Sequence, residues 1–346
     1  MFDKLIGNNH ISEVLRRLLI SKRVPNALLF AGQDGIGKKQ FALELAKSLI
    51  CLDPKNSEAC DVCTACRRAD KFIFPVPTDK NKPEFEKVFL SEHSDVGIVI
   101  KYKNSILIDA IRNLEKEANF RPYEAKARFF IIDDSDKMND SASNALLKTL
   151  EEPPASSHLF LITSRPDALL PTIRSRCQTL RFAPIATGEI ENYLLQTKEF
   201  APADAALAAR LANGKLGHAL NSNIENFKAN RAAMLKVLES VLIREDRAEL
   251  LRIGEEMNDA KNKDDFETRL DILQNLIHDV WTIRQNAVAK LLINFDIAVE
   301  LQRFADNADA KKLAAWLAET ETLREQLAVN LNRKIATDAL FMQMAG

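Results

Sequence analysis

Three short runs of apolar residues in the first half of the chain predict buried β-strands. They occupy residues 27–31, 129–132 and 159–163, and polar residues flank each of them. A continuous apolar run of this length is typical of a strand that is buried on both faces of a parallel sheet. We therefore expect these three runs to lie in one sheet.

Helical patterns lie between the predicted strands. Leu45 and Leu49 recur at helical spacing after the first run, and a second helix is predicted over 141–152. We expect Asp140 or Ser141 to cap the second helix at its N-terminus, because short polar side chains accept hydrogen bonds from the first free N–H groups. Strands that alternate with helices predict an α/β fold.

The pattern changes after Pro184, where strand signals end and the chain becomes rich in Ala, Leu, Glu and Lys. We predict an α/β core over 1–184, a small helical domain over 185–235 and a domain of long amphipathic helices over 236–346. Residues 70–92, which contain three prolines, predict an irregular surface insertion in the core.

Five apolar residues near the end of the chain recur at helical spacing. This spacing predicts that they share one face of a long helix. The residues are Leu323, Leu327, Leu331, Ile335 and Ala339.

The charge of the chain is nearly balanced. Its 346 residues include 48 Lys and Arg against 49 Asp and Glu, a formal net charge of −1. Sequence-independent DNA binding requires Lys and Arg that neutralise phosphates, so any DNA contact has to be local or shared with other chains. Because we find no run of about 18 apolar residues and no signal-peptide pattern, we expect a cytoplasmic protein that uses no membrane.

A glycine-rich segment follows the first predicted strand. Residues 32–39 read Gly-Gln-Asp-Gly-Ile-Gly-Lys-Lys, in which Gly32, Gly35, Gly37 and Lys38 match the spacing of a P-loop. In a P-loop, N–H groups at the start of a helix surround phosphates, and the lysine reaches the β- and γ-phosphate oxygens. The segment predicts a site for ATP, with a glycine-rich turn that binds nothing as the alternative.

Two positions depart from the pattern of an ATP-hydrolysing P-loop. Lys39 replaces the Ser or Thr that normally binds Mg²⁺, and its charge repels the metal. Asp133 follows the second strand, where P-loop ATPases order the Mg²⁺ site, and Asp134 stands where related ATPases usually carry the longer Glu. The alternative is that Asp133, Asp134 and Asp136 cap the strand end or the next helix. We expect weak or absent ATP hydrolysis.

Four of the five cysteines form a cluster. Cys51, Cys60, Cys63 and Cys66 have the spacing C-x8-C-x2-C-x2-C, which suits four thiolates that converge on one structural zinc ion. An iron–sulfur cluster uses similar gaps, but no proline follows Cys66. Disulfides are the other alternative, and the absence of a secretory signal disfavours them. Cys177 lies apart from the cluster.

Basic residues gather at the end of the predicted core. Arg174 and Arg176 lie in the segment 171–177, after the third strand. Such residues usually form a solvated face. In oligomeric ATPases, however, an arginine at a domain edge can enter the nucleotide site of the next subunit and raise its rate by about 10³- to 10⁵-fold. The chain could therefore supply catalysis to a neighbour.

Together these motifs resemble the AAA+ subunits of the bacterial DNA polymerase III clamp loader. The resemblance is carried by the P-loop, the four-cysteine insertion, the segment 144–154 (Asn-Ala-Leu-Leu-Lys-Thr-Leu-Glu-Glu-Pro-Pro) and the Ser-Arg-Cys triplet at 175–177. It extends from residue 1 to about residue 220. A DNA-repair or recombination AAA+ helicase is possible on fold alone, but it does not explain the cysteine insertion beside the Ser-Arg-Cys triplet.

Within that family, three residues are more similar to the delta-prime class, a stator, than to the ATP-hydrolysing gamma/tau class. They are Lys39, Asp134, and Gly217, which stands where the motor carries a phosphate-sensing Arg. Thr163 matches the first sensor position. The resemblance implies that Arg176 acts as an arginine finger on a neighbouring motor subunit, and a gamma/tau-like motor is the alternative.

The resemblance also implies domain roles and partners. It implies an AAA+ core over 1–184 with a zinc module at 51–66, a helical lid over 185–235, and a helical collar over 236–346 that joins a five-subunit ring. The partners would be the gamma/tau and delta subunits and, through the complex, the sliding clamp and primed DNA. The chain would then serve DNA replication as a component of DNA polymerase III, a DNA-directed DNA polymerase.

Overall fold

The chain forms two compact units in the computed structural model. The first unit contains residues 1–196 and 212–220, and the second contains 197–211 and 221–346. The predicted lid therefore has residues in both units, and the three-domain division stays a prediction. The structure describes residues 1–197, 199–259, 265–286, 292–327 and 332–346.

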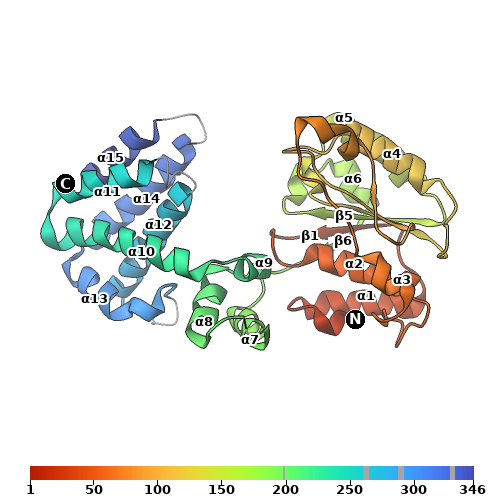
Figure 1. Ribbon diagram of the computed structural model, residues 1–346, viewed down its shortest axis with the longest axis horizontal. Helices are drawn as coiled ribbons and strands as arrows, with labels where there is room; N and C mark the ends of the chain where they lie inside the picture. The colour runs from red at the N-terminus through yellow and green to blue at the C-terminus, as the bar shows by residue number, and fades with distance from the viewer. Residues whose placement is uncertain (198, 260–264, 287–291, 328–331) are drawn as a thin grey trace. The chain divides into compact units, whose positions relative to one another are not determined.

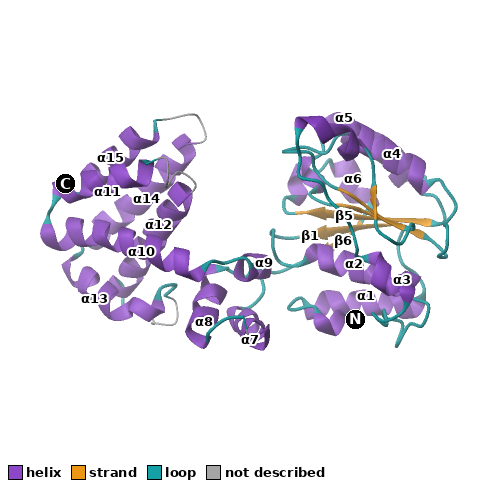
Figure 2. Ribbon diagram, viewed as in Figure 1, coloured by secondary structure: helices purple, strands orange, loops and turns teal. Residues whose placement is uncertain are grey.

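The first unit is built around a six-stranded sheet with the order β2-β3-β4-β5-β1-β6 (Figure 2). Adjacent strands are parallel, except that β2 and β3 are antiparallel. The three predicted strands are confirmed as β1, β4 and β5, and the other three escaped prediction because they are short. The strands are β1 (Ala27–Ala31), β2 (Phe89–Leu90), β3 (Val96–Val99), β4 (Arg128–Ile132), β5 (Ser157–Thr163) and β6 (Gln178–Arg181).

Helices cover both faces of this sheet (Figure 1). Side chains alternate along each strand, so Leu28 and Phe30 pack with α1, α2 and α3, while Leu29 packs with α4, α5 and α6 on the other face. The helices of this unit are α1 (Asn9–Ser21), α2 (Lys38–Ile50), α3 (Thr64–Ala69), α4 (Ile108–Ala118), α5 (Asp140–Glu151), α6 (Pro171–Arg176), α7 (Thr187–Thr197) and α9 (Leu216–Leu220), with 3-10 helices η1 (Phe2–Lys4), η2 (Asp79–Glu86), η3 (Ser135–Lys137) and η4 (Pro166–Ala168).

Two local expectations in this unit need correction. The N-cap of α5 is Asn139, whose side chain accepts from the N–H of Ala142 at 2.9 Å. Asp140 and Ser141 already lie inside the helix, where a side chain cannot cap its own first turn. The segment 70–92 is only partly irregular, because it contains η2 and β2, and its Phe85 is buried.

The second unit is entirely helical in the part that the structure describes. Its core is formed by apolar side chains of α10 to α15. The predicted fold class, a P-loop-type α/β core followed by helical structure, is confirmed, and no described helix is long and apolar enough to cross a membrane. The elements are α8 (Pro202–Leu211), α10 (Ile224–Glu239), the π-helix η5 (Ser240–Arg244), α11 (Arg247–Asn258), α12 (Phe266–Arg284), the 3-10 helix η8 (Phe295–Ile297), α13 (Ala298–Asn307), α14 (Ala310–Leu327) and α15 (Arg333–Met344).

The predicted single helix face near the end of the chain is wrong. Leu323 lies on α14 and Ile335 on α15, and Leu331 falls outside the described residues. A new helix starts at Arg333 because the side chain of Asn332 caps it, accepting from the N–H groups of residues 334 and 335.

A buried ion pair holds the edge of β3 to the loop that enters β4. Asp95 is fully buried and accepts from the N–H groups of Tyr123, Glu124 and Ala125 at 2.8–2.9 Å. The guanidinium of the fully buried Arg128 lies 3.6 Å from the same carboxylate. The same guanidinium lies 2.9 Å from Oε2 of Glu117, so two carboxylates share the charge of Arg128 in the interior.

We predict that Asp95→Ala destabilises the first unit by roughly 3–5 kcal/mol, because it removes one of the two carboxylates that face Arg128 and leaves three N–H donors without their acceptor. Amide hydrogen exchange of β3 and β4 in rising urea measures this change. Tryptophan fluorescence does not, since Trp281 and Trp316 both lie in the second unit. Asp109→Ala on the exposed face of α4 is the control, and equal losses for both variants would contradict the prediction.

Candidate functional site

The loop 32–37 joins β1 to α2 at the carboxyl edge of the sheet. Gly37, the N-cap of α2, has a φ of 92° and Gly35 a φ of 74°, in the left-handed region that favours glycine. A Cβ atom at Gly32 would lie 2.7 Å from the carbonyl oxygen of Phe182. Each glycine of the predicted P-loop therefore has a steric reason to be glycine.

The lysine of the motif is turned back onto its own loop. Lys38 is 5% exposed, and its Nζ donates to the carbonyl oxygens of Gly32 at 2.6 Å and Gln33 at 2.5 Å. Burial lowers the pKa of Lys38, because the charged form loses solvation. These two carbonyls use two of the three N–H donors of the ammonium group, and Lys38 also lines the cavity over the loop.

The two aspartates after β4 are each paired with a lysine. The Nζ of Lys39 lies 3.0 Å from Oδ2 of Asp133, and the Nζ of Lys101 lies 2.8 Å from Oδ2 of Asp134. The hydrogen bond to Asp134 raises the pKa of Lys101 and keeps it charged. Two ammonium groups thus neutralise the carboxylates that a P-loop ATPase uses around Mg²⁺. Asp134 is also the N-cap residue of η3, although its side chain makes no cap hydrogen bond.

Lys101 was missed in the sequence because nothing in its local pattern marks it. It follows β3, a four-residue strand that we did not predict, and it reaches Asp134 only because β3 and β4 are parallel neighbours. A parallel arrangement brings the carboxyl ends of adjacent strands to the same edge.

A cavity of about 540 Å³ lies over the loop. The N–H of Gly217 in α9 donates to the carbonyl oxygen of Gly35 at 2.8 Å, so the backbone of α9 rests directly on the loop. A Cβ atom at position 217 would lie 3.4 Å from that oxygen. The residues that line the cavity are Asp34, Gly35, Gly37, Lys38, Lys39, Gln40, Lys101, Asp133, Asp134, Ile162, Leu216, Gly217 and Leu220.

Thr163 at the end of β5 is fully buried and directed at a third aspartate. Its Oγ1 donates to Oδ1 of Asp136 at 2.8 Å, and the guanidinium of Arg165 lies 3.3 Å from the other carboxylate oxygen. Although burial opposes ionisation, these hydrogen bonds lower the pKa of Asp136. The hydroxyl at the predicted sensor position is therefore already engaged within the core.

The four clustered cysteines converge at the C-terminal end of α2. Their Sγ atoms all lie within 4.8 Å of one another, with Cys51 and Cys63 4.0 Å apart, and none forms a disulfide. Tetrahedral ligation at a Zn–S distance of about 2.3 Å requires a compact set of this kind. Although burial opposes it, N–H donors from Cys66 and Leu52 lower the pKa of Cys63 to about 6, whereas burial raises the pKa of Cys51 and of Cys66. The donor set and its geometry therefore fit a bound metal ion.

Cys177 is separate from this cluster. It is buried under the opposite face of the sheet, with the side chains that pack against α5 and α6. Burial raises the pKa of Cys177 to about 12, so the thiol stays protonated and unreactive.

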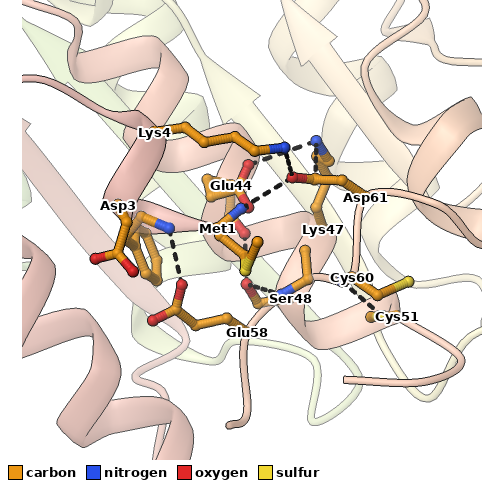
Figure 3. A network of polar contacts seen from close by, with 12 residues as sticks. Met1, Asp3, Lys4, Glu44, Lys47, Ser48, Cys51, Glu58, Cys60 and Asp61 are labelled. Carbon is orange, nitrogen blue, oxygen red and sulfur yellow. Dashed lines mark hydrogen bonds and ion pairs between the residues drawn. The ribbon is translucent and has the colours of Figure 1, made fainter. Parts of the chain in front are cut away.

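Ion pairs fasten the cysteine module, residues 51–66, to the helical layer beneath it (Figure 3). Asp61, between two of the cysteines, lies 2.6 Å from Nζ of Lys4 and 2.8 Å from Nζ of Lys47 on α2. Although burial opposes them, these cations hold the pKa of Asp61 well below its usual range. Glu58 accepts from the N–H of Phe2 at 2.8 Å. The module is thus anchored to α2 and to the start of the chain.

Arg176, at the C-terminal end of α6, takes part in two contacts. Its Nη2 donates to Oε1 of Glu151 at 2.7 Å, and its Nη1 donates to the carbonyl oxygen of Thr172 at 2.9 Å. Its side chain is 34% exposed. Arg174 pairs instead with Asp167, 2.7 Å away. The two arginines of the Ser-Arg-Cys region therefore have different partners, and neither lines the cavity over the loop 32–37.

Family comparisons cover nearly the whole chain. The family model described as "DNA polymerase III, delta subunit" matches residues 7–186, and the one described as "DNA polymerase III, delta subunit, C terminal" matches residues 225–344. The first match alone covers more than half of the chain.

Individual relatives differ in how much of their length is matched. DNA polymerase III subunit delta' of Bacillus subtilis is 29% identical over 93% of this chain and 91% of that protein. The Escherichia coli subunit delta' is 28% identical over 92% of this chain and 88% of that protein. DNA polymerase III subunit tau of B. subtilis is also 29% identical, but the match covers 79% of this chain and 46% of that protein.

Proposed function

The chain belongs to the family of DNA polymerase III delta subunits, and we propose that it acts in the clamp loader as a delta-prime type of subunit that does not hydrolyse ATP. Membership confirms the resemblance to DNA polymerase III subunits that the motifs carry, and the match to delta-prime relatives over about nine-tenths of both chains supports that class. The observation that carries the proposal is the pairing of Lys39 with Asp133 and of Lys101 with Asp134.

These two ion pairs oppose the binding of Mg²⁺. A divalent cation about 4 Å from an ammonium group is repelled by roughly 8 kcal/mol at an effective dielectric constant of about 20. Lys39 supplies such a group where a motor subunit supplies a hydroxyl, and it neutralises the carboxylate of Asp133. A metal could enter only if this lysine left.

The same arrangement opposes the activation of water. The carboxylate that orients the attacking water has to be free to accept its proton or hydrogen bond. The carboxylate of Asp134 is shorter than that of Glu and is held by Lys101. Thr163 donates to Asp136 within the core. Three groups of the hydrolytic machinery are therefore occupied by partners within the chain.

We further propose that Arg176 serves a neighbouring gamma/tau subunit as an arginine finger. Its partial exposure at the end of α6 supports the proposal, as does its place in the Ser-Arg-Cys triplet of the family resemblance. An arginine finger stabilises the charge that develops on the transferred phosphoryl group and can raise the rate by about 10³- to 10⁵-fold. In this role the chain contributes to ATP hydrolysis without carrying it out.

The proposed complex is a five-subunit ring with gamma/tau and delta subunits that loads the sliding clamp onto primed DNA. The helices of 236–346 would form the collar of that ring, and 185–235 would form the lid. A nearly neutral chain has little electrostatic affinity for DNA, which agrees with a DNA contact that several subunits share.

We propose that the cysteine module binds a structural zinc ion through Cys51, Cys60, Cys63 and Cys66. Four sulfur ligands within 4.8 Å of one another leave no place for a substrate, as in closed structural zinc sites. Because the module is fastened to α2 by ion pairs, the ion would stabilise the first unit rather than take part in a reaction.

We expect the purified chain to contain one zinc ion and Cys63→Ser to reduce both metal content and thermal stability. A structural zinc site contributes on the order of 10 kcal/mol of binding free energy at neutral pH. Elemental analysis and thermal unfolding with and without chelator measure the two effects. Cys177→Ser, outside the cluster, should keep the full zinc content. Bound iron with visible absorbance, or a metal-free chain with oxidised cysteines, would contradict the assignment.

The chain alone should show no ATP hydrolysis above background at saturating Mg-ATP. Phosphate release in the steady state measures this, and Lys38→Ala should leave the rate unchanged. The double variant Lys39→Thr with Asp134→Glu restores the metal-binding hydroxyl and the longer carboxylate, so it should bind Mg-nucleotide more tightly than the parent chain. Robust turnover by the parent that Lys38→Ala abolishes would instead identify a gamma/tau-like motor.

In the reconstituted complex, Arg176→Ala should lower the ATP hydrolysis of the adjacent motor site by about 10²-fold or more. Assembly, measured by size-exclusion chromatography, should be unchanged because the side chain is partly exposed. Arg174→Ala, on the same helix but paired with Asp167, is the matched control. An unaltered ATPase rate in the Arg176 variant would exclude the finger role.

A further inference from the structure

Glu151 is the carboxylate that contacts the proposed finger. It is the last residue of α5, and its Oε1 accepts from Nη2 of Arg176 at 2.7 Å. The Thr172 carbonyl oxygen accepts from Nη1 at 2.9 Å. We propose that Glu151 is a positioning residue, which orients the Arg176 guanidinium for the phosphates of the neighbouring subunit. This inference rests on the finger role proposed above.

The contacts with Glu151 and Thr172 leave some N–H donors of the Arg176 guanidinium available for a phosphate. A guanidinium carries five N–H donors in a rigid fork. In the described part of the chain, Arg176 donates to Glu151 and Thr172 from its two terminal nitrogens. The remaining donors can bind phosphate oxygens while these contacts persist. A phosphate ligand and Glu151 can therefore be held by the same side chain.

The support behind Glu151 is rigid. Leu146 and Leu150 of α5 and Ile173 of α6 belong to one buried cluster beneath the sheet. Each of these side chains is at most 5% exposed. Because both helices are packed on the same face, the carboxylate at the end of α5 has a defined position relative to α6. An arginine bound to it loses rotamer freedom before it meets a substrate, which favours the reaction.

The ion pair of Arg176 and Glu151 adds little to the stability of the fold. The side chains of Arg176 and Glu151 are 34% and 50% exposed, and ion pairs this exposed contribute little to folding. The neighbouring pair of Arg174 and Asp167 differs, because Asp167 is 93% exposed on the short helix η4 rather than at the end of a packed helix. Of the two pairs, the one with the anchored carboxylate contains the proposed finger.

The test is a double-mutant cycle in the reconstituted clamp loader. Glu151→Gln, Arg176→Ala and their combination are compared for kcat and KM of ATP hydrolysis. We expect Glu151→Gln to lower kcat roughly 3- to 10-fold, as for the loss of one charge-assisted hydrogen bond, without changing KM or thermal stability. The double variant should be no slower than Arg176→Ala alone. Glu152→Gln, one residue further and exposed, is the matched control.

The possible results distinguish the finger role of Arg176 from the positioning role of Glu151. If Arg176→Ala leaves the rate unaltered, the finger role itself fails. If Arg176→Ala lowers kcat but Glu151→Gln does not, the finger stands and the positioning role of Glu151 is overturned. A further loss on adding Glu151→Gln to Arg176→Ala would also overturn it, because Glu151 would then act through another group.

Discussion

The burial of one parallel sheet between two helical layers is the constraint on which the candidate site depends. Strands β1, β3, β4 and β5 run in the same direction, so their carboxyl ends meet at one edge. The P-loop, Lys101 and the Asp133–Asp134 pair follow three of these ends, and Thr163 is the last residue of β5. Residues more than one hundred positions apart become neighbours because the sheet places the strand ends together.

At this edge the chain keeps the backbone of a P-loop but supplies its own cations. The glycines retain the conformations that the loop requires, and α2 begins directly behind them. Lys39 and Lys101 then occupy the two carboxylates around which a motor subunit would arrange Mg²⁺. The P-loop can keep its backbone conformation without binding Mg²⁺, because the conformation depends on backbone torsion angles whereas metal binding depends on local charge.

Helix α2 connects the two motifs that the sequence marks most clearly. It begins at Lys38 in the P-loop and ends at Ile50, next to the first cysteine of the module. Its 13 residues span about 20 Å, so the metal-binding cysteines lie far from the phosphate site. Lys47 and Ser48, near the end of α2, both tie the module to this helix, through Asp61 and the N–H of Ala59. The distance agrees with a structural role for a metal ion.

The sequence by itself determined the features that depend on neighbouring residues. The buried strands β1, β4 and β5, the P-loop, the cysteine cluster and the change to helical structure after Pro184 are all local patterns of spacing and polarity. It also marked Lys39 as a departure, because that position belongs to the motif. The N-cap of α5 was assigned one or two residues too late, since Asn139, Asp140 and Ser141 are all plausible caps and only the backbone torsion angles distinguish them.

Only the tertiary structure decided which charges meet. The partners Lys101 of Asp134, Asp136 of Thr163 and Glu151 of Arg176 lie between 25 and 33 residues away along the chain, and no periodic pattern connects them. Strand neighbours and helix packing set these contacts, because a sheet is assembled from segments whose order in space differs from their order in the sequence. The family can therefore be inferred from local motifs. Whether the carboxylates of this chain's nucleotide site are free or paired depends on ion pairs between residues distant in the sequence.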